Sequence, residues 1–225
     1  MDTVNIGAKA LHQVCRQESH MPVIVVANPK GGVGKSTLST NVAGYLARQG
    51  HAVMLGDVDP QQSARLWLNL RPPQAVPVRA WEVAHDHVVR PPKGTTHVVL
   101  DTPAGLSGKR LEAVMKMADK VLVPLQPSIF DIHATHDFLL RLADYKRSSK
   151  VQIGVVGMRV RDGSISATQL QQFLASTDIP VIGYLRDTQN YVQVAARGLT
   201  IWDIAKSRVE RDLAQWEPIV TWLNH

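Results

Sequence analysis

Residues 28–37 read NPKGGVGKST, and this stretch decides the fold. It follows Val23 to Asn28, a short run rich in β-branched residues that predicts a buried central strand. It leads into Ser36 to Arg48, where apolar residues recur at helical spacing up to Gly50 and predict a helix. A strand, a glycine-rich loop and a helix in this order form the setting in which proteins hold phosphate groups.

The loop departs from the usual spelling of a P-loop but keeps its mechanics. The pattern Gly-x-x-x-x-Gly-Lys-[Ser/Thr] would place a glycine at position 29, where this chain has Pro29. The remaining glycines let backbone N–H groups turn toward phosphate oxygens, and the next helix points its positive end at the same anion. We expect Lys35 to reach the β- and γ-phosphates and Ser36 to offer its hydroxyl to Mg²⁺. The predicted nucleotide-binding residues are Gly31, Gly32, Val33, Gly34, Lys35, Ser36, Thr37 and Asp57.

Three aspartates follow predicted strands downstream of this loop. Asp57 and Asp59 follow the strand Ala52 to Gly56, and their spacing of two places them on the same side of an extended chain. Asp101 ends the apolar strand His97 to Leu100, where an unpaired charge is costly and a Mg²⁺ shell would offset that cost. Each aspartate alone is also compatible with a helix cap or a turn, but three of them after one phosphate loop favour a catalytic site.

Short strands alternate with helices along the rest of the chain. The alternation predicts an α/β fold, a single-domain P-loop NTPase with a mostly parallel twisted sheet and helices on both faces. The other expected strands are Val76–Trp81, Lys120–Pro124, Val151–Val156 and Pro180–Tyr184, and the other expected helices are Lys109–Met117, Ile129–Lys146 and Ser164–Ser176.

The composition narrows the class of protein. The chain has 225 residues, of which 44% are hydrophobic and 20% charged, as in a globular domain. A single cysteine, Cys15, excludes an internal disulfide and a cysteine-ligated metal cluster. No apolar run approaches the roughly 20 residues that span a bilayer, and the first residues lack a secretory pattern, so we expect a cytoplasmic location. The net charge of +6 fits either a solvated basic surface or a polyanionic partner such as nucleic acid.

The loop spelling KGGVGKST, with its early Lys30, resembles the deviant Walker A motif of the ParA/MinD family of ATPases. GDVDPQQSA at 56–64 and VVLDTPAG at 98–105 resemble the two switch motifs of that family, and VPLQPSIFDI at 123–132 resembles its turn beside the nucleotide. The similarity runs from about Pro22 to about Leu223. We therefore expect residues 22–225 to form a ParA-like ATPase domain and residues 1–21 to form an appendage, helical over Thr3 to Gln17.

The resemblance implies ATP and Mg²⁺ as cofactors and assigns roles to residues. Lys30 would reach across a dimer to the nucleotide of the partner, which relieves the repulsion between two facing triphosphates; the alternative is a solvated loop lysine that serves its own site. Asp59 would orient the attacking water, and Asp57 would support the water or Mg²⁺ network. The implied catalytic residues are Lys30, Lys35 and Asp59, and the implied Mg²⁺ residues are Ser36, Asp59 and Asp101.

Residues 154–163, GVVGMRVRDG, depart from the family pattern. Many members carry an asparagine near the position of Met158 that contacts adenine. We therefore expect backbone groups after Leu185 to read the base in this chain.

The C-terminal segment separates the subgroups of the family. Apolar residues at helical spacing predict a terminal helix packed on the domain; they are Val209, Leu213, Trp216, Val220 and Leu223. Pro218 is expected to kink this helix, and no lysine or arginine follows Arg211. MinD-type relatives end instead in a basic amphipathic membrane helix. The C-terminal segment thus favours a ParA-type protein. The alternatives are a MinD-type membrane-associated positioning ATPase and an accessory ATPase of a biosynthetic complex.

ParA-type relatives bind DNA without sequence preference as ATP-bound dimers, and residues 184–203 resemble the segment before their last helix. The expected DNA contacts, which are also compatible with plain solvated surface, are Arg186, Arg197, Lys206, Arg208 and Arg211. The resemblance thus implies a cytoplasmic, nucleoid-associated ATPase with slow, partner-stimulated hydrolysis. Its expected partners are a second copy of itself, nonspecific DNA and an unidentified ParB-like or adaptor protein. Its cargo would be a plasmid, a chromosome or a protein assembly.

Overall fold

A computed structural model describes residues 21–82 and 91–225. Seven strands in these ranges form one sheet in the order β3-β2-β4-β1-β5-β6-β7, and every strand pair is parallel. The strands are β1 (Val23–Val26), β2 (Val53–Asp57), β3 (Arg79–Trp81), β4 (His97–Asp101), β5 (Lys120–Leu125), β6 (Gln152–Val160) and β7 (Val181–Arg186). The predicted α/β fold with a parallel sheet is confirmed.

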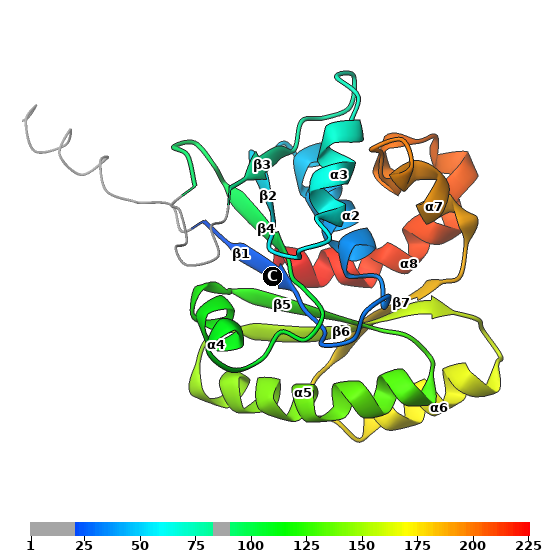
Figure 1. Cartoon of the computed structure of the whole chain (residues 1–225). Coiled ribbons are helices and arrows are strands. Elements are labelled where there is room, and N and C mark those ends of the chain that lie inside the picture. The colour runs from blue at the N-terminus through cyan, green and yellow to red at the C-terminus, as the bar shows by residue number, and fades with distance from the viewer. Residues whose placement is uncertain (1–20, 83–90) are drawn as a thin grey trace, which may run out of the picture.

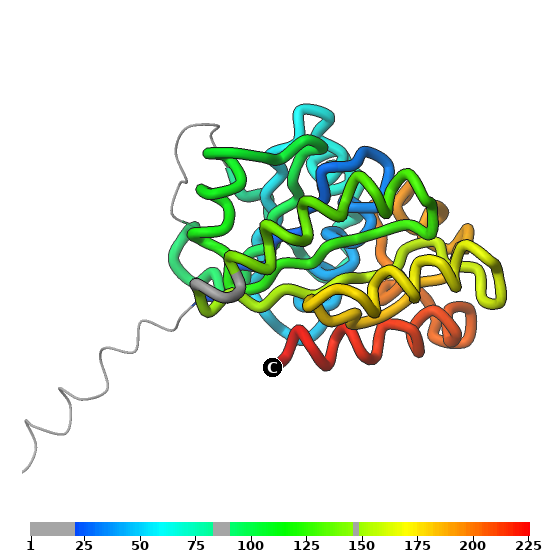
Figure 2. Tube along the Cα trace, turned by 90° about the horizontal axis from the view of Figure 1, so that it is seen from below, coloured from blue at the N-terminus to red at the C-terminus, as the bar shows by residue number. Residues whose placement is uncertain are grey.

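Helices cover both faces of this sheet (Figure 1). They are α2 (Lys35–Arg48), α3 (Ser63–Leu70), α4 (Gly108–Met117), α5 (Ile129–Ser148), α6 (Ile165–Ala175), α7 (Gln189–Ala195) and α8 (Lys206–Asn224), with the short 3-10 helix η1 (Ile201–Asp203) before α8. The helices α4, α5 and α6 lie on one face, and α2, α3, α7 and α8 lie on the other. In both views α5 and α6 run side by side (Figure 1, Figure 2).

The central strand β1 shows why the sheet sits between two layers. Its residues alternate between two hydrophobic cores: Val23 and Val25 face the layer of α4 to α6, while Ile24 and Val26 face the layer of α2 and α8. All four side chains are buried. A strand that is buried on both faces needs a continuous apolar run, and the sequence VIVV supplies it.

Two helices were not expected from the sequence, and one expected kink lies elsewhere. The helices α3 and α7 occupy segments for which no helix was predicted. The prediction of a kink at Pro218 is wrong, since α8 continues through this residue and its non-helical backbone lies at Val209. Pro218 is exposed, so the backbone carbonyl that loses its helical partner can be hydrated. The expected helix over Thr3 to Gln17 lies outside the described residues.

The register of the strands brings the site residues to one edge of the sheet. Asp101 at the end of β4 stands opposite Val26 of β1 on one side and opposite Asp57 of β2 on the other. The loop of residues 28–34 leaves the same edge directly after β1. In parallel sheets ligands bind in the crevice outside the carboxyl ends of the strands. Among the described residues, no helix combines the length and the apolarity that a membrane crossing requires.

Candidate functional site

The glycine loop folds over the amino end of α2 and borders an open cleft of about 610 Å³. Gly32 and Gly34 have left-handed backbone conformations, with φ of 76° and 98°, which residues with a Cβ adopt at a cost. The cleft is lined by the loop on one side and by Asp59 and the segment 103–106 on others. Its volume suits a small-molecule ligand, and the helix amino terminus suits an anionic one.

Lys35 is buried and lines the cleft. Its Nζ donates a hydrogen bond to the carbonyl oxygen of Lys30, at 2.7 Å, so the side chain spans the loop from inside. Burial lowers the pKa of Lys35, whereas the nearby carboxylates of Asp101 and Asp59 act in the opposite direction. The ammonium group of Lys35, beneath the glycine loop, is placed to bind phosphate oxygens that the loop amides also bind.

Asp101 is the most buried charged group at this edge of the sheet, with no exposed surface. Its Oδ1 accepts a hydrogen bond from the Ser39 hydroxyl at 3.1 Å, while Oδ2 is buried and has no partner among the described residues. Burial raises the pKa of Asp101 to about 7, against the lowering effect of Ser36, Ser39 and Lys35. An orphaned carboxylate oxygen next to Ser36 and Lys35 fits the hydrated shell of a Mg²⁺ ion.

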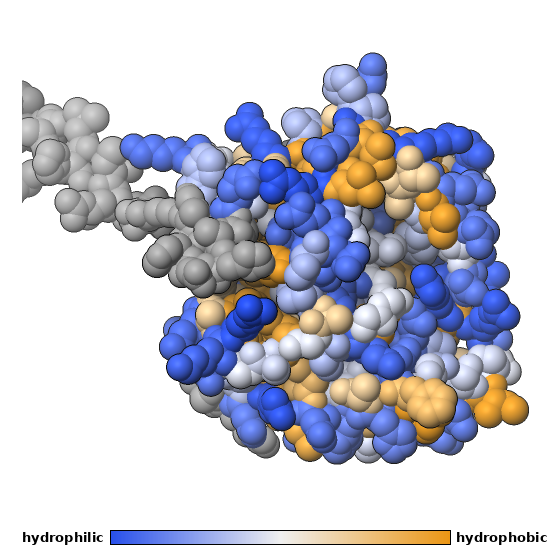
Figure 3. Space-filling model, viewed as in Figure 1, coloured by the Kyte–Doolittle hydropathy of each residue, from blue (hydrophilic) through white to orange (hydrophobic). Residues whose placement is uncertain are grey.

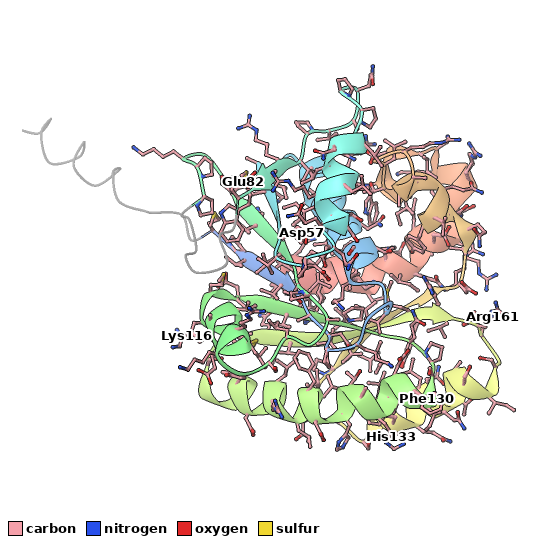
Figure 4. The ribbon with its side chains drawn as sticks, viewed as in Figure 1. Asp57, Glu82, Lys116, Phe130, His133 and Arg161 are labelled. Carbon is pink, nitrogen blue, oxygen red and sulfur yellow. The ribbon has the colours of Figure 1, made fainter. Side chains whose placement is uncertain are left out.

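Asp57 and Asp59 take different positions after β2. Both oxygens of Asp57 are occupied by backbone amides: Oδ1 accepts from Asp59, at 3.0 Å, and Oδ2 accepts from Ala64 and Arg65 at the start of α3. Asp59 lies in the wall of the cleft, where its Oδ1 accepts from the amide of Gln61. The carboxylate of Asp57 therefore holds the backbone that carries Asp59, and Asp59 is the carboxylate that a ligand can meet. Figure 4 shows Asp57 at the end of β2, near the start of α3.

The loop is held in place by residues that were not predicted as site residues. The fully buried side chain of Asn28 donates to the carbonyl oxygen of Pro124 and to the hydroxyl of Thr135, and it accepts from the amide of Lys30. Gln126 donates to the carbonyl oxygen of Gly32 at 2.8 Å. A polar residue directly after a fully apolar strand was the available signal for Asn28, because such a residue must find partners when buried.

Lys30 lies on the rim of the site, not inside it. Its Nζ is 3.9 Å from Oδ1 of Asp131 in the first turn of α5, and 42% of its side chain is exposed. A long, exposed pair of this kind contributes little to stability. The two lysines of the loop therefore have different environments: Lys35 points under the loop, and Lys30 points to solvent.

Met158, near the position of the adenine-contacting asparagine of many family members, packs against the glycine loop. The Met158 side chain is buried against Gly34, where an added Cβ would lie 2.9 Å from its Cε. Two arginines that were not predicted as site residues, Arg110 and Arg159, also line the cleft.

The five basic residues that were predicted to touch DNA are only partly brought together. Arg186 is half-buried, and its Nε donates to the buried carboxylate of Asp212 at 2.5 Å. The other four are exposed at the end of the molecule formed by α7 and the start of α8 (Figure 1); they are Arg197, Lys206, Arg208 and Arg211. Arg211 pairs with the exposed Asp162, at 3.2 Å.

The comparisons with known proteins agree with this geometry. Residues 24–201 match the model of the CobQ/CobB/MinD/ParA nucleotide binding domain. The chain is 30% identical over 191 residues to the maintenance of carboxysome distribution protein A of Gloeobacter kilaueensis, covering 81% of this chain and 85% of that protein. It is 29% identical over 169 residues to the chromosome-partitioning ATPase Soj of Thermus thermophilus, covering 61% of this chain and 68% of that protein.

A solved structure supports the fold. The plasmid partition protein BB_S35 of Borrelia burgdorferi, bound to AMPPNP, superposes with a TM-score of 0.67 at 16% identity, covering 90% of this chain and 99% of that one. The family match covers most of the chain and includes the loop, both switch segments and the edge of the sheet that carries Asp101. The chain belongs to the CobQ/CobB/MinD/ParA family of nucleotide-binding proteins.

Proposed function

We propose that this chain is a ParA-type ATPase that binds Mg²⁺ and ATP, dimerises around the nucleotide, binds DNA without sequence preference and positions a cargo through a partner protein. The observation that carries the proposal is the unpartnered Oδ2 of Asp101, buried beside Lys35 and Ser36, which line the loop cleft. This set of groups is what a metal–triphosphate complex requires and is costly without one.

The residues of the cleft have separate tasks in hydrolysis. Lys35 and the loop amides bind the phosphate chain, and Ser36 and Asp101 hold Mg²⁺, directly or through water. Mg²⁺, when bound, neutralises charge on the phosphate oxygens. Asp59 accepts a hydrogen bond from the attacking water and orients it, and Asp57 keeps Asp59 in position through the amide contact at 3.0 Å. With so little covalent chemistry for the protein to perform, positioning accounts for most of the rate.

The proposed dimer is supported by the position of Lys30. Its Nζ leaves the cleft of its own chain and has only the loose contact with Asp131 to give up. Next to it, Ile129 and Phe130 at the start of α5 are 51% and 77% exposed, and Figure 4 shows Phe130 at the outer end of that helix. An exposed cation and exposed apolar side chains beside the nucleotide cleft suit a second copy of the chain that meets this rim.

The proposed DNA surface is the basic end formed by Arg197, Lys206, Arg208 and Arg211. The same proposal places the protein in the cytoplasm, in association with the nucleoid. The apolar stripe of α8 packs on the domain itself, since Val209, Trp216 and Leu223 are buried. The viewed face in Figure 3 is mostly hydrophilic, with apolar side chains scattered over it. The names of the relatives, which refer to carboxysome distribution and chromosome partitioning, support a role in positioning a cargo.

One experiment separates the main alternatives. The Asp59→Ala variant, with Mg²⁺ and ATP, is expected to form a dimer in size-exclusion chromatography with light scattering and to shift a nonspecific DNA duplex in a gel. With ADP both effects should be absent. A monomer under all conditions would overturn the dimer, and a dimer that binds vesicles of anionic lipid but not DNA would favour the MinD-type alternative. A dimer that binds neither would point to an accessory ATPase.

A further inference from the structure

We infer that Arg159 is a further nucleotide-binding residue, whose guanidinium contacts the phosphate chain of the nucleotide in the loop cleft. The inference rests on the proposed function, because it names a ligand contact within the same site. Arg159 lines the cleft together with Gly34, Lys35 and Asp59, although it comes from β6, far from the loop in sequence.

The backbone at Arg159 has an unusual conformation. Its φ of 53° lies in the left-handed region, which among the described non-glycine residues occurs only here and at Gln62. The register between β6 and β7 shifts between Gly157 and Val160, so Arg159 occupies an irregularity at the end of its strand. Irregularities of this kind redirect side chains next to active sites, and backbone strain tends to persist where it serves a site.

The preceding residue fixes this irregularity to the phosphate loop. Met158 is buried, and its Cε fills the space where Gly34 has no side chain. The end of β6 is thereby packed on the loop glycine that precedes Lys35. Arg159, which is exposed, directly follows this residue and lines the same cleft.

The charges around Arg159 distinguish it from three other arginines of this end of the sheet, each of which has a carboxylate partner. Arg161 pairs with Asp187 at 2.8 Å, Arg186 pairs with Asp212, and Arg211 pairs with Asp162. Within residues 21–82 and 91–225, Arg159 has neither a carboxylate partner nor a hydrogen bond through its guanidinium. An arginine without a partner in the wall of an anion-binding cleft is suited to bidentate contact with phosphate oxygens.

A matched pair of variants tests the inference. Arg159→Met removes the guanidinium, and Arg161→Met removes an exposed arginine two residues away that is not part of the cleft lining. Figure 4 shows Arg161 pointing outward at the margin of the molecule. Binding of Mg²⁺–AMPPNP and Mg²⁺–ADP to the full chain is measured by isothermal titration calorimetry. Because Arg159→Met removes a hydrogen bond to a charged group, we expect Kd to rise about 10- to 100-fold with at least one nucleotide, and to change less than about twofold for Arg161→Met.

A second variant separates binding from folding. Glycine accepts φ of 53° without strain, so Arg159→Gly is expected to unfold at the same temperature as the wild type or higher, while its affinity falls as far as that of Arg159→Met. A rise in Kd below tenfold in both Arg159 variants, or an equal rise in Arg161→Met, overturns the inference while nucleotide binding by the wild type still supports the proposed function. A wild-type chain that binds neither nucleotide overturns both.

Discussion

The carboxylate of Asp57 accepts a hydrogen bond from the backbone amide of Ala64, at 2.8 Å, and thereby caps the amino end of α3, although Asp57 lies outside this helix. The amide of Arg65 shares the same oxygen at 3.0 Å, so two of the unpaired N–H groups of the first turn are satisfied. Within the helix start itself no side chain performs this task. These hydrogen bonds therefore tie the end of β2 to the start of α3.

The first prediction concerns this contact. Asp57→Asn replaces one acceptor oxygen with an amide that cannot accept, so it should lower the free energy of unfolding by about 1–2 kcal/mol and weaken the placement of Asp59. ATP hydrolysis should fall more than nucleotide affinity does. Thermal unfolding and steady-state ATPase assays measure the two effects, with Asp162→Asn as an exposed control. Unchanged stability and hydrolysis would show that the cap is dispensable.

The second prediction is a pH dependence at Asp101. Its pKa is raised by burial to about 7 in the folded chain, from 3.8, so the folded state holds the proton more tightly than the unfolded state. The stabilisation is complete below about pH 4 and disappears as the pH rises through about 7. Asp101→Asn cannot ionise. In EDTA and without nucleotide, the Tm of the variant minus that of the wild type should increase from pH 5 to pH 8, and about 1 kcal/mol corresponds to about 2–4 °C. Parallel curves would contradict the raised pKa.

The third prediction concerns the end of α8. The buried Nζ of Lys120 donates to the carbonyl oxygens of Trp222 and Leu223, at 2.7 and 2.9 Å, and lies over the Trp222 ring. These carbonyls have no partners within the helix. Lys120→Met should destabilise the fold by about 1–3 kcal/mol and leave nucleotide affinity unchanged, while Lys116→Met, at an exposed position, should do neither. Equal melting curves for the two variants would refute the capping role.

The sequence predicted most of the sheet because each buried strand is a short apolar run, as in Val23 to Val26. It did not predict α3, since the group that caps this helix is Asp57, which lies six residues before the helix begins. A local search for caps cannot find such a partner. For α7 the signal was present: Thr188 accepts from the amide of Asn190, and Gly198 follows the helix with a positive φ. The helix has only seven residues, which is too short for a clear period.

The candidate site was predicted as far as local motifs reach. The phosphate loop and its aspartates follow from residue types at fixed spacing, whereas Asn28 and Arg159 depend on contacts across the sheet. Asn28 meets Thr135, which lies 107 positions away, and the role of Arg159 depends on a register shift against β7. Similarly, the sequence did not reveal that Arg186 pairs with the buried Asp212, because Asp212 lies on another element. Arg186 was therefore predicted to contact DNA.

The fourth prediction separates the two lysines of the loop. Lys35→Ala should abolish nucleotide binding, because it removes the buried cation beneath the loop. Lys30→Ala should keep nucleotide affinity within about threefold but abolish the ATP-dependent dimer, because both cations between the facing triphosphates are then missing. Light scattering in an Asp59→Ala background measures the dimer, with Lys93→Ala as an exposed control on another part of the chain. Normal dimerisation and hydrolysis by Lys30→Ala would refute a role across the interface.

The fifth prediction tests the basic end of the molecule and depends on which arginine is changed. Arg186 neutralises the buried carboxylate of Asp212, so Arg186→Ala should destabilise the fold by about 3–5 kcal/mol, and any decrease in DNA binding would then be a folding effect. Lys206 and Arg208 are exposed, and a Lys206→Glu, Arg208→Glu double variant should keep its stability and its affinity for ATP. If both residues bind phosphates, the slope of log affinity for nonspecific DNA against log salt should become shallower by about 0.9 for each phosphate that the variant no longer neutralises. A Lys116→Glu, Arg141→Glu double variant, exposed on α4 and α5 in the other helix layer, makes the same change in net charge and serves as the control. An equal effect in the control would mean that the net charge of the protein, and not this surface, attracts DNA.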